Sequence, residues 1–105
     1  MSLPTRLGFV RLEMHQAEAA IPLLKDVVSR QPNHFDAHFE LGKGLLEQGK
    51  VEDAIQYLET SVHLHPTDYA FYQLSVAYRR EGRANDADQA MLMYQKLRPK
   101  PPAPQ

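Results

Sequence analysis

Residues 35–68, FDAHFELGKGLLEQGKVEDAIQYLETSVHLHPTD, decide the fold of this chain. Their pattern predicts a first helix of about His34–Gln48, a turn at Gly49 and a second helix of about Val51–His65. Pro66 then ends the second helix, because proline cannot continue a helix and biases the residue before it away from helical geometry. The segment therefore predicts a helix hairpin, and it serves as the template for the rest of the chain.

The same residue types recur on both sides of this segment at spacings of 34 and 33 residues. The recurring columns are Leu7, Leu41 and Leu74; Ala20, Ala54 and Ala87; Leu24, Leu58 and Met91; and Pro32, Pro66 and Pro99. Four columns that share one pair of spacings are hard to obtain by chance. A fixed period of this length is typical of stacked helical repeats.

Each column has a physical role in a hairpin of two helices. Gly8 and Gly42 follow their leucines, and Ser75 takes that place in the third copy. A small residue here lets the first helix approach the second closely. The alanine column forms the other side of that contact, where a larger side chain would push the axes beyond ~8–10 Å.

With these columns the chain resembles the tetratricopeptide repeat family, whose pattern is an aromatic, Leu-Gly, a large residue, Ala, a large apolar residue and Pro. The resemblance covers about residues 4–99. The middle copy matches with His38, Leu41, Gly42, Leu45, Ala54, Leu58 and Pro66. The first copy departs at Pro4 and Arg11, where the family usually has large apolar residues.

The resemblance implies an all-α fold, a right-handed α-solenoid of three antiparallel helix pairs. The expected domain is 1–99, with repeats of about 1–34, 35–67 and 68–99, followed by a proline-rich tail at 100–105. The remaining helices are expected at about Pro4–Met14, Ala17–Gln31, Asp68–Glu81 and Ala84–Leu97.

Local signals refine these helix boundaries. Asn33 and Thr67 are expected to cap the first helices of the second and third pairs. Gly49 and Gly82 are expected to end those helices. Pro22 is expected near the first turn of its helix, where the missing N–H costs little and a slight kink can form.

Composition excludes several classes of function. The formal net charge of −1 gives no basic patch for nucleic acid or an anionic membrane surface. The absence of cysteine excludes disulfides and thiolate metal sites. No apolar run approaches the ~20 residues of a membrane span, and the start of the chain lacks the features of a secretory signal. The compartment stays undetermined, with a cytoplasmic location favoured.

The resemblance implies a function in binding a partner peptide or helix in a concave groove. Family grooves use positions of the first helix in each pair that face away from the second. The positions predicted to bind are Phe9, Phe39, Lys43, Leu46, Tyr69, Tyr72 and Arg79. The aromatics would supply apolar anchors, and Lys43 and Arg79 would pair with acids or carbonyls of the partner. The alternative is that the superhelix buries these side chains between neighbouring helices.

A well-known ligand mode of the family is a clamp of Lys, Asn and Arg residues that holds the acidic tails of chaperones. The clamp positions here are Thr5, Phe9, Glu40, Tyr69 and Gln73. None of them is a Lys, Asn or Arg, and Glu40 has the wrong sign. The sequence therefore predicts no binding of acidic chaperone tails.

Catalysis, metal and cofactor binding are not expected. His34 and His38 have a ligand-like spacing of four, but no third ligand is evident nearby. Ser61 and His65 share that spacing, but Ser61 occupies a small-residue position inside the hairpin. The tail contains Arg98 and spaced prolines that loosely fit a ligand of proline-reading domains, although such ends are more often linkers.

Two rival functions stay open. The chain could be a structural or self-assembly module, in which a second copy covers the uncovered side of the last helix, expected at Ala90, Tyr94 and Leu97, and forms a homo-dimer. It could also be a non-catalytic arm of a larger protein. The favoured function is a non-enzymatic protein-interaction scaffold with an unidentified protein or peptide partner.

Overall fold

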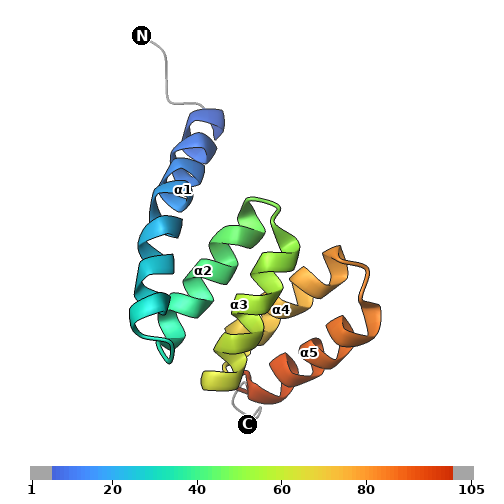
Figure 1. Cartoon of the computed structure of the whole chain (residues 1–105). Coiled ribbons are helices and arrows are strands. Elements are labelled where there is room, and N and C mark those ends of the chain that lie inside the picture. Colours follow the sequence, from blue (N-terminus) through green and yellow to red (C-terminus); the bar gives the residue numbers. More distant parts are fainter. Residues whose placement is uncertain (1–5, 101–105) are drawn as a thin grey trace.

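The computed structural model describes the backbone of residues 6–100 and the side chains of residues 18–100. Within residues 6–100 the chain forms five helices and no strand (Figure 1). They are α1 (Arg6–Arg30), α2 (Phe35–Glu47), α3 (Val51–Leu64), α4 (Asp68–Arg80) and α5 (Ala84–Leu97). The prediction of an all-α fold is thereby confirmed.

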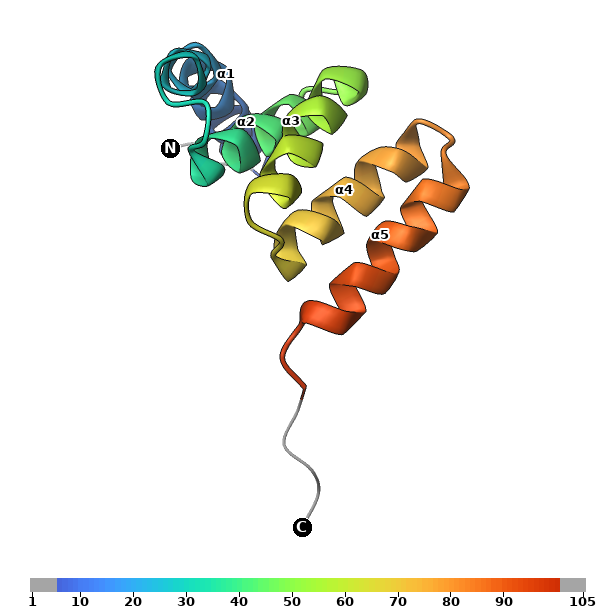
Figure 2. The same cartoon turned by 60° about the horizontal axis from the view of Figure 1, so that its bottom comes forward.

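Two helix hairpins form the body of the described structure. Helix α2 packs most extensively on α3, and α4 packs most extensively on α5. Helix α1 lies against α2, and α3 lies against α4, so each helix contacts its neighbour in sequence. Figure 2 shows α1 and α5 at the two ends of this array. Helix α2 also touches α4, which places the first helix of one pair on the first helix of the next.

Glycine ends the first helix of each hairpin, as predicted. Gly49 and Gly82 have φ values of 79° and 80°, in the left-handed region that favours glycine. The N–H of the following residue then bonds back five residues, from Lys50 to the Leu45 carbonyl at 2.9 Å and from Arg83 to the Tyr78 carbonyl at 2.8 Å. This arrangement satisfies carbonyls at the helix end and reverses the chain within a short turn.

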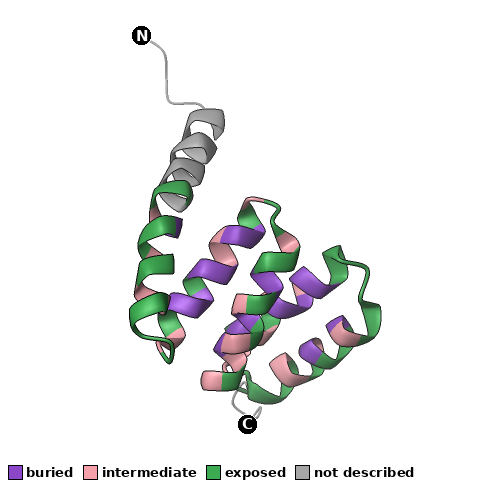
Figure 3. Ribbon diagram, viewed as in Figure 1, coloured by how far each residue is buried: buried purple, intermediate pink, exposed green. Residues whose placement is uncertain are grey.

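The core lies between the helices of each pair and between the pairs, where buried residues gather on α2, α3 and α4 (Figure 3). The repeat columns supply it: Leu41, Ala54, Leu58 and Ala87 are fully buried. A Cβ atom added at Gly42 would lie 2.6 Å from Leu58 Cγ. The small-residue column therefore permits the close approach of α2 and α3 that the sequence predicted.

The prediction of two separate helices in the first copy, about Pro4–Met14 and Ala17–Gln31, is wrong. The structure has one continuous helix, α1, across both segments. The later copies break at Gly49 and Gly82, but the corresponding position of the first copy is His15. Without a glycine there, no residue favours the left-handed geometry of the turn, and the helix continues.

Two details of α1 and α2 also differ from prediction. Pro22 lies in the interior of α1 rather than in a first turn, so one intrahelical hydrogen bond is missing there. The N-cap of α2 is His34 rather than Asn33, because His34 Nδ1 accepts the Ala37 N–H at 3.0 Å. Thr67 does cap α4 as predicted, and its Oγ1 accepts the Ala70 N–H at 3.3 Å.

The outer side of α5 is uncovered only in part. Leu97 is exposed and Tyr94 is half-buried, but Ala90 is buried, which corrects its predicted exposure. Ala90 borders a groove formed with α3 and α4. In the part of the chain that the structure describes, no helix is long and apolar enough to cross a membrane. Of the predicted tail, only Lys100 is among the described residues, and it is not helical.

Candidate peptide-binding surface

An aromatic cluster joins the start of α2 to the start of α4. The Tyr69 ring meets the Phe39 ring edge to face, with centroids 5.1 Å apart, and lies 6.2 Å from the Phe35 ring. His65 packs edge to face on Phe35 at 5.4 Å. Such aromatic arrangements add stability beyond the apolar area that they bury. Tyr69 nevertheless keeps 48% of its surface exposed, so part of its ring faces solvent.

Two of the predicted binding residues are buried within the chain. Phe39 is 8% exposed and Leu46 is 4% exposed. Helix α4 contacts both residues: Tyr69 packs on Phe39, and Arg80 Nη1 donates to the Leu46 carbonyl at 3.2 Å. For these two side chains the arrangement corresponds to the packing alternative, in which neighbouring helices bury them.

The corresponding residues of the third copy are open to solvent. Tyr72 is 44% exposed, and its ring lies 5.5 Å from the Tyr94 ring of α5. Arg79 is exposed, and its guanidinium lies 3.8 Å from the Asp88 carboxylate in an ion pair that is itself largely solvated. An ion pair of this kind contributes ~0–1 kcal/mol, so it holds Arg79 only weakly.

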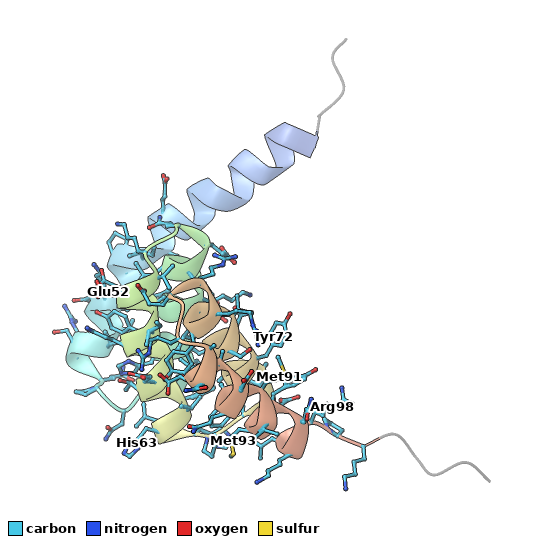
Figure 4. The ribbon with its side chains drawn as sticks, turned by 90° about the vertical axis from the view of Figure 1, so that its right-hand side faces the viewer. Glu52, His63, Tyr72, Met91, Met93 and Arg98 are labelled. Atoms are coloured by element: carbon cyan, nitrogen blue, oxygen red, sulfur yellow. The ribbon has the colours of Figure 1, made fainter. Side chains whose placement is uncertain are left out.

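Tyr72 and Arg79 border one open hollow, which we call the α4–α5 hollow. Its volume is ≈ 400 Å³, and its lining consists of Tyr72, Ser75, Val76, Arg79, Arg80 and Met91. In Figure 4, Tyr72 and Met91 lie close together on one side of the ribbon, with Glu52 and His63 on the opposite side. The hollow thus combines an apolar floor with two arginines at one end.

The remaining predicted binding residues are dispersed. Lys43 is half-buried on α2, and Phe9 lies outside the described side chains. Three of the clamp positions are also described: Glu40 and Tyr69 are exposed, and Gln73 is half-buried. The structure therefore brings Tyr72 and Arg79 together at the hollow, with Tyr69 earlier on the same helix, and it leaves Lys43 on a different helix.

A second groove, which sequence reasoning did not predict, lies between α3, α4 and α5. Its volume is ≈ 230 Å³, and its lining consists of Glu59, Val62, Phe71, Leu74, Tyr78, Asp86, Gln89, Ala90 and Met93. Tyr78 donates its hydroxyl to Glu59 Oε2, and Arg83 lies 4.6 Å above the Tyr78 ring. Burial and the hydrogen bond to Glu59 raise the pKa of Tyr78 well above its ordinary value. The sequence feature that could have indicated this groove is Tyr78, which stands where the second copy has Leu45.

The histidine and serine patterns have structural roles. His38 is buried, and its Nε2 lies 2.8 Å from the Pro32 carbonyl oxygen, while His34 caps α2. Ser61 is fully buried and donates to the Leu58 carbonyl at 2.7 Å, so its hydroxyl is not accessible. Among residues 18–100 no three His, Asp or Glu side chains gather as metal ligands would.

Paired helices with short glycine turns and small-residue contacts define a helical-repeat scaffold, and sequence profiles specify which one. Profiles described as tetratricopeptide repeat match residues 11–77 and residues 69–100. The chain belongs to the tetratricopeptide repeat family. Repeats of this family form a non-catalytic protein-interaction fold, so the chain is in general terms a scaffold for protein–protein interaction.

Solved structures of MamA are similar to this chain. MamA AMB-1 in the P212121 crystal form is 25% identical with a TM-score of 0.75 over 87% of this chain and 49% of that one. The C2221 form is 25% identical with a TM-score of 0.76, over 88% and 54%. MamA MSR-1 is 23% identical with a TM-score of 0.73, over 86% and 51%, which supports the fold alone.

This chain spans about half the length of these MamA chains, at 49%, 54% and 51%. A search of curated proteins found no match.

Proposed function

We propose that this chain binds a partner peptide or helix through the exposed part of its concave face, without enzymatic activity of its own. One observation carries the proposal: the third copy exposes Tyr72 and Arg79 around an open hollow, where the second copy buries the equivalent residues. An exposed aromatic beside a flexible cation is a usual anchor of a protein interface.

Tyr69 and Lys43 extend this face toward the second copy. Tyr69, a member of the aromatic cluster, is half exposed, and Lys43 lies on α2. Phe39 and Leu46 pack against α4 beneath this face and do not touch the partner. Phe9 stays in the proposed set on the sequence pattern alone. We retain the division into repeats of about 1–34, 35–67 and 68–99 as part of the proposal, with a proline-rich tail at 100–105.

The proposed partner is not an acidic chaperone tail. Of the clamp positions, Glu40 is exposed and negative, and it would repel a carboxylate. Titration with a labelled peptide that ends in two aspartate or glutamate residues should therefore give no saturable binding. Micromolar affinity for such a peptide would refute this part of the proposal.

Two alternatives remain, each with its own observation. Leu97 is exposed on α5, which favours a homo-dimer through the last helix. The chain also spans about half of the MamA chains that it resembles, at 49% of one of them, which favours a non-catalytic arm of a longer protein. Sedimentation of the chain alone tests the first alternative, and the full reading frame tests the second.

Peptide display tests the proposed function without a known partner. The full chain is immobilised, panned with a random-peptide library and compared with a variant that combines Tyr72→Ala and Arg79→Glu. We expect enriched peptides to lose most of their binding to the variant while its helical circular dichroism is unchanged. Peptides that bind both proteins equally would place the binding surface elsewhere and contradict the proposal.

A further inference from the structure

The α4–α5 hollow lies on a surface of the third copy that is equivalent to the surface of the second copy covered by α4. A shift of 33 residues relates Phe39 to Tyr72, Leu46 to Arg79 and Leu58 to Met91. Phe39, Leu46 and Leu58 are all buried. Tyr72 and Arg79 are exposed, and Met91 is only half-buried. The surface that stacks a further helix in the second copy is thus empty of any described helix in the third.

The chain itself shows what kind of element fits this surface. Helix α4 lies on the second copy with an aromatic near its start, Tyr69, whose ring packs on Phe39 at 5.1 Å. Near its end, Arg80 reaches the Leu46 carbonyl at 3.2 Å. An α-helix with one apolar side therefore covers such a surface from Phe39 to Leu46. A helix of similar length would extend from Tyr72 to Arg79 on the third copy.

The third copy differs in charge at one end of this surface. Where the second copy has Leu46, the third has Arg79, and Arg80 follows it. Arg98 lies 5.8 Å above the Tyr94 ring, which in turn contacts Tyr72, so a third cation lies near the Tyr72 end of the surface. The nearby acid, Asp88, pairs with Arg79 at 3.8 Å, and both side chains are more than half exposed. The occupant should therefore carry acidic residues opposite these arginines.

We propose that the α4–α5 hollow binds an amphipathic helix of a partner protein, which stacks on α4 and α5 as a sixth helix and carries acidic residues opposite Arg79. The inference rests on the proposed function, because it uses Tyr72 and Arg79 of the same face, and it adds the partner's conformation and charge. An isologous contact with a second copy would bring two surfaces bordered by arginines together, which charge repulsion disfavours.

Two peptides derived from this chain provide the probe. Both contain residues 66–83, which include α4, and both carry the same chemical staple, because an isolated helix of this length is marginal in water. One keeps the native sequence, and the other carries R79E and R80E. Their apolar faces are identical, so a difference in affinity reports charge at the last turn.

Fluorescence anisotropy with the full chain should show tighter binding of the acidic peptide by about fivefold, the value of one exposed charge pair. Arg79→Glu in the protein should remove or reverse this preference. Tyr72→Ala should weaken the acidic peptide by about tenfold through loss of the aromatic anchor. Leu92→Ala, which removes another exposed apolar side chain of α5 that does not line the hollow, should leave affinity unchanged.

Three results would overturn the inference: equal binding of the two peptides, full binding to Tyr72→Ala, or a dimer that Tyr72→Ala dissociates. The last would assign the hollow to a second copy. Thermal unfolding of each variant separates lost binding from lost fold. If neither peptide binds while display peptides still depend on Tyr72 and Arg79, this inference fails and the proposed function stands. If display peptides bind the variant with Tyr72→Ala and Arg79→Glu as well as they bind the wild type, the proposed function fails, and this inference, which rests on it, fails too.

Discussion

The second and third helix pairs have the same architecture but different neighbours. The α2–α3 pair has α1 on one side and α4 on the other, and its repeat residues Leu41 and Leu58 are fully buried. Among residues 6–100, the α4–α5 pair has helical neighbours on one side only, where α4 contacts α3 and α2. Equivalent positions of the two repeats therefore have different roles. Phe39 stabilises the fold, and Tyr72 forms part of the surface. Paired substitutions at equivalent positions test this comparison directly.

The largest difference is expected between Leu58→Ala and Met91→Ala. Leu58 is fully buried, so its truncation should cost about 4 kcal/mol of unfolding free energy. Met91 faces the open hollow and is half-buried, so its truncation should cost about 1–2 kcal/mol. Urea denaturation followed by circular dichroism measures both values. Equal losses would mean that the third pair is covered in solution.

Phe39→Ala and Tyr72→Ala should differ next. Phe39 is buried against Phe35 and Tyr69, and loss of its ring should cost about 3 kcal/mol. Tyr72 is nearly half exposed, and its removal should cost about 1 kcal/mol. The same denaturation series measures them. A large loss of stability for Tyr72→Ala would show that this residue is part of the core and not available to a partner.

The helix boundaries indicate how far the sequence determined the structure. Helices α3, α4 and α5 begin at Val51, Asp68 and Ala84 as the sequence predicted, because glycine turns and proline stops are local signals. The first copy lacks the turn glycine, and its two expected helices merge into α1. The repeat signature of that copy did not indicate this, because its columns describe contacts between helices and not the turn that joins them.

The candidate site was less predictable than the fold. The family resemblance placed Phe39, Leu46, Tyr72 and Arg79 on one kind of helix face. It could not say which of them a neighbouring helix covers, because that depends on how many repeats follow. The burial of Phe39 under α4 and the exposure of Tyr72 at the end of the array emerge only from the stacking. The contact of Tyr78 with Glu59 also required the structure, since these residues are distant in sequence.

The small-residue column provides a third comparison. Gly42→Ala would place a Cβ 2.6 Å from Leu58 Cγ and 3.2 Å from the Ala54 carbonyl oxygen, and we expect a loss of about 2 kcal/mol. Ser75→Ala should change stability by less than about 1 kcal/mol, because Ser75 already carries a Cβ and its hydroxyl bonds only to the Tyr72 carbonyl of the same helix. Thermal unfolding measures both. A neutral Gly42→Ala would argue against close contact between α2 and α3.

Tyr78→Phe should have a smaller effect, about 1 kcal/mol at neutral pH, because it removes a hydrogen bond to the exposed Glu59. The raised pKa of Tyr78 means that the folded state favours the protonated hydroxyl. This contribution to stability is complete below the ordinary tyrosine pKa of about 10 and declines as pH rises above it.

Denaturation between about pH 9 and pH 11.5, a window that spans the ordinary tyrosine pKa, tests this prediction. The wild type should lose stability more steeply than Tyr78→Phe over that range. Parallel pH profiles of the two proteins would indicate that Tyr78 is not buried against Glu59 in solution.

The central claim is that the third pair is open where the second is closed, and NMR amide shifts test it most directly. The isotope-labelled full chain is titrated with the acidic peptide of residues 66–83 that carries R79E and R80E. We expect saturable shifts at Tyr72, Val76 and Arg79, with the equivalent Phe39, Lys43 and Leu46 unchanged. Shifts at the buried Phe39 and Leu46, or none at Tyr72, Val76 and Arg79, would contradict the account.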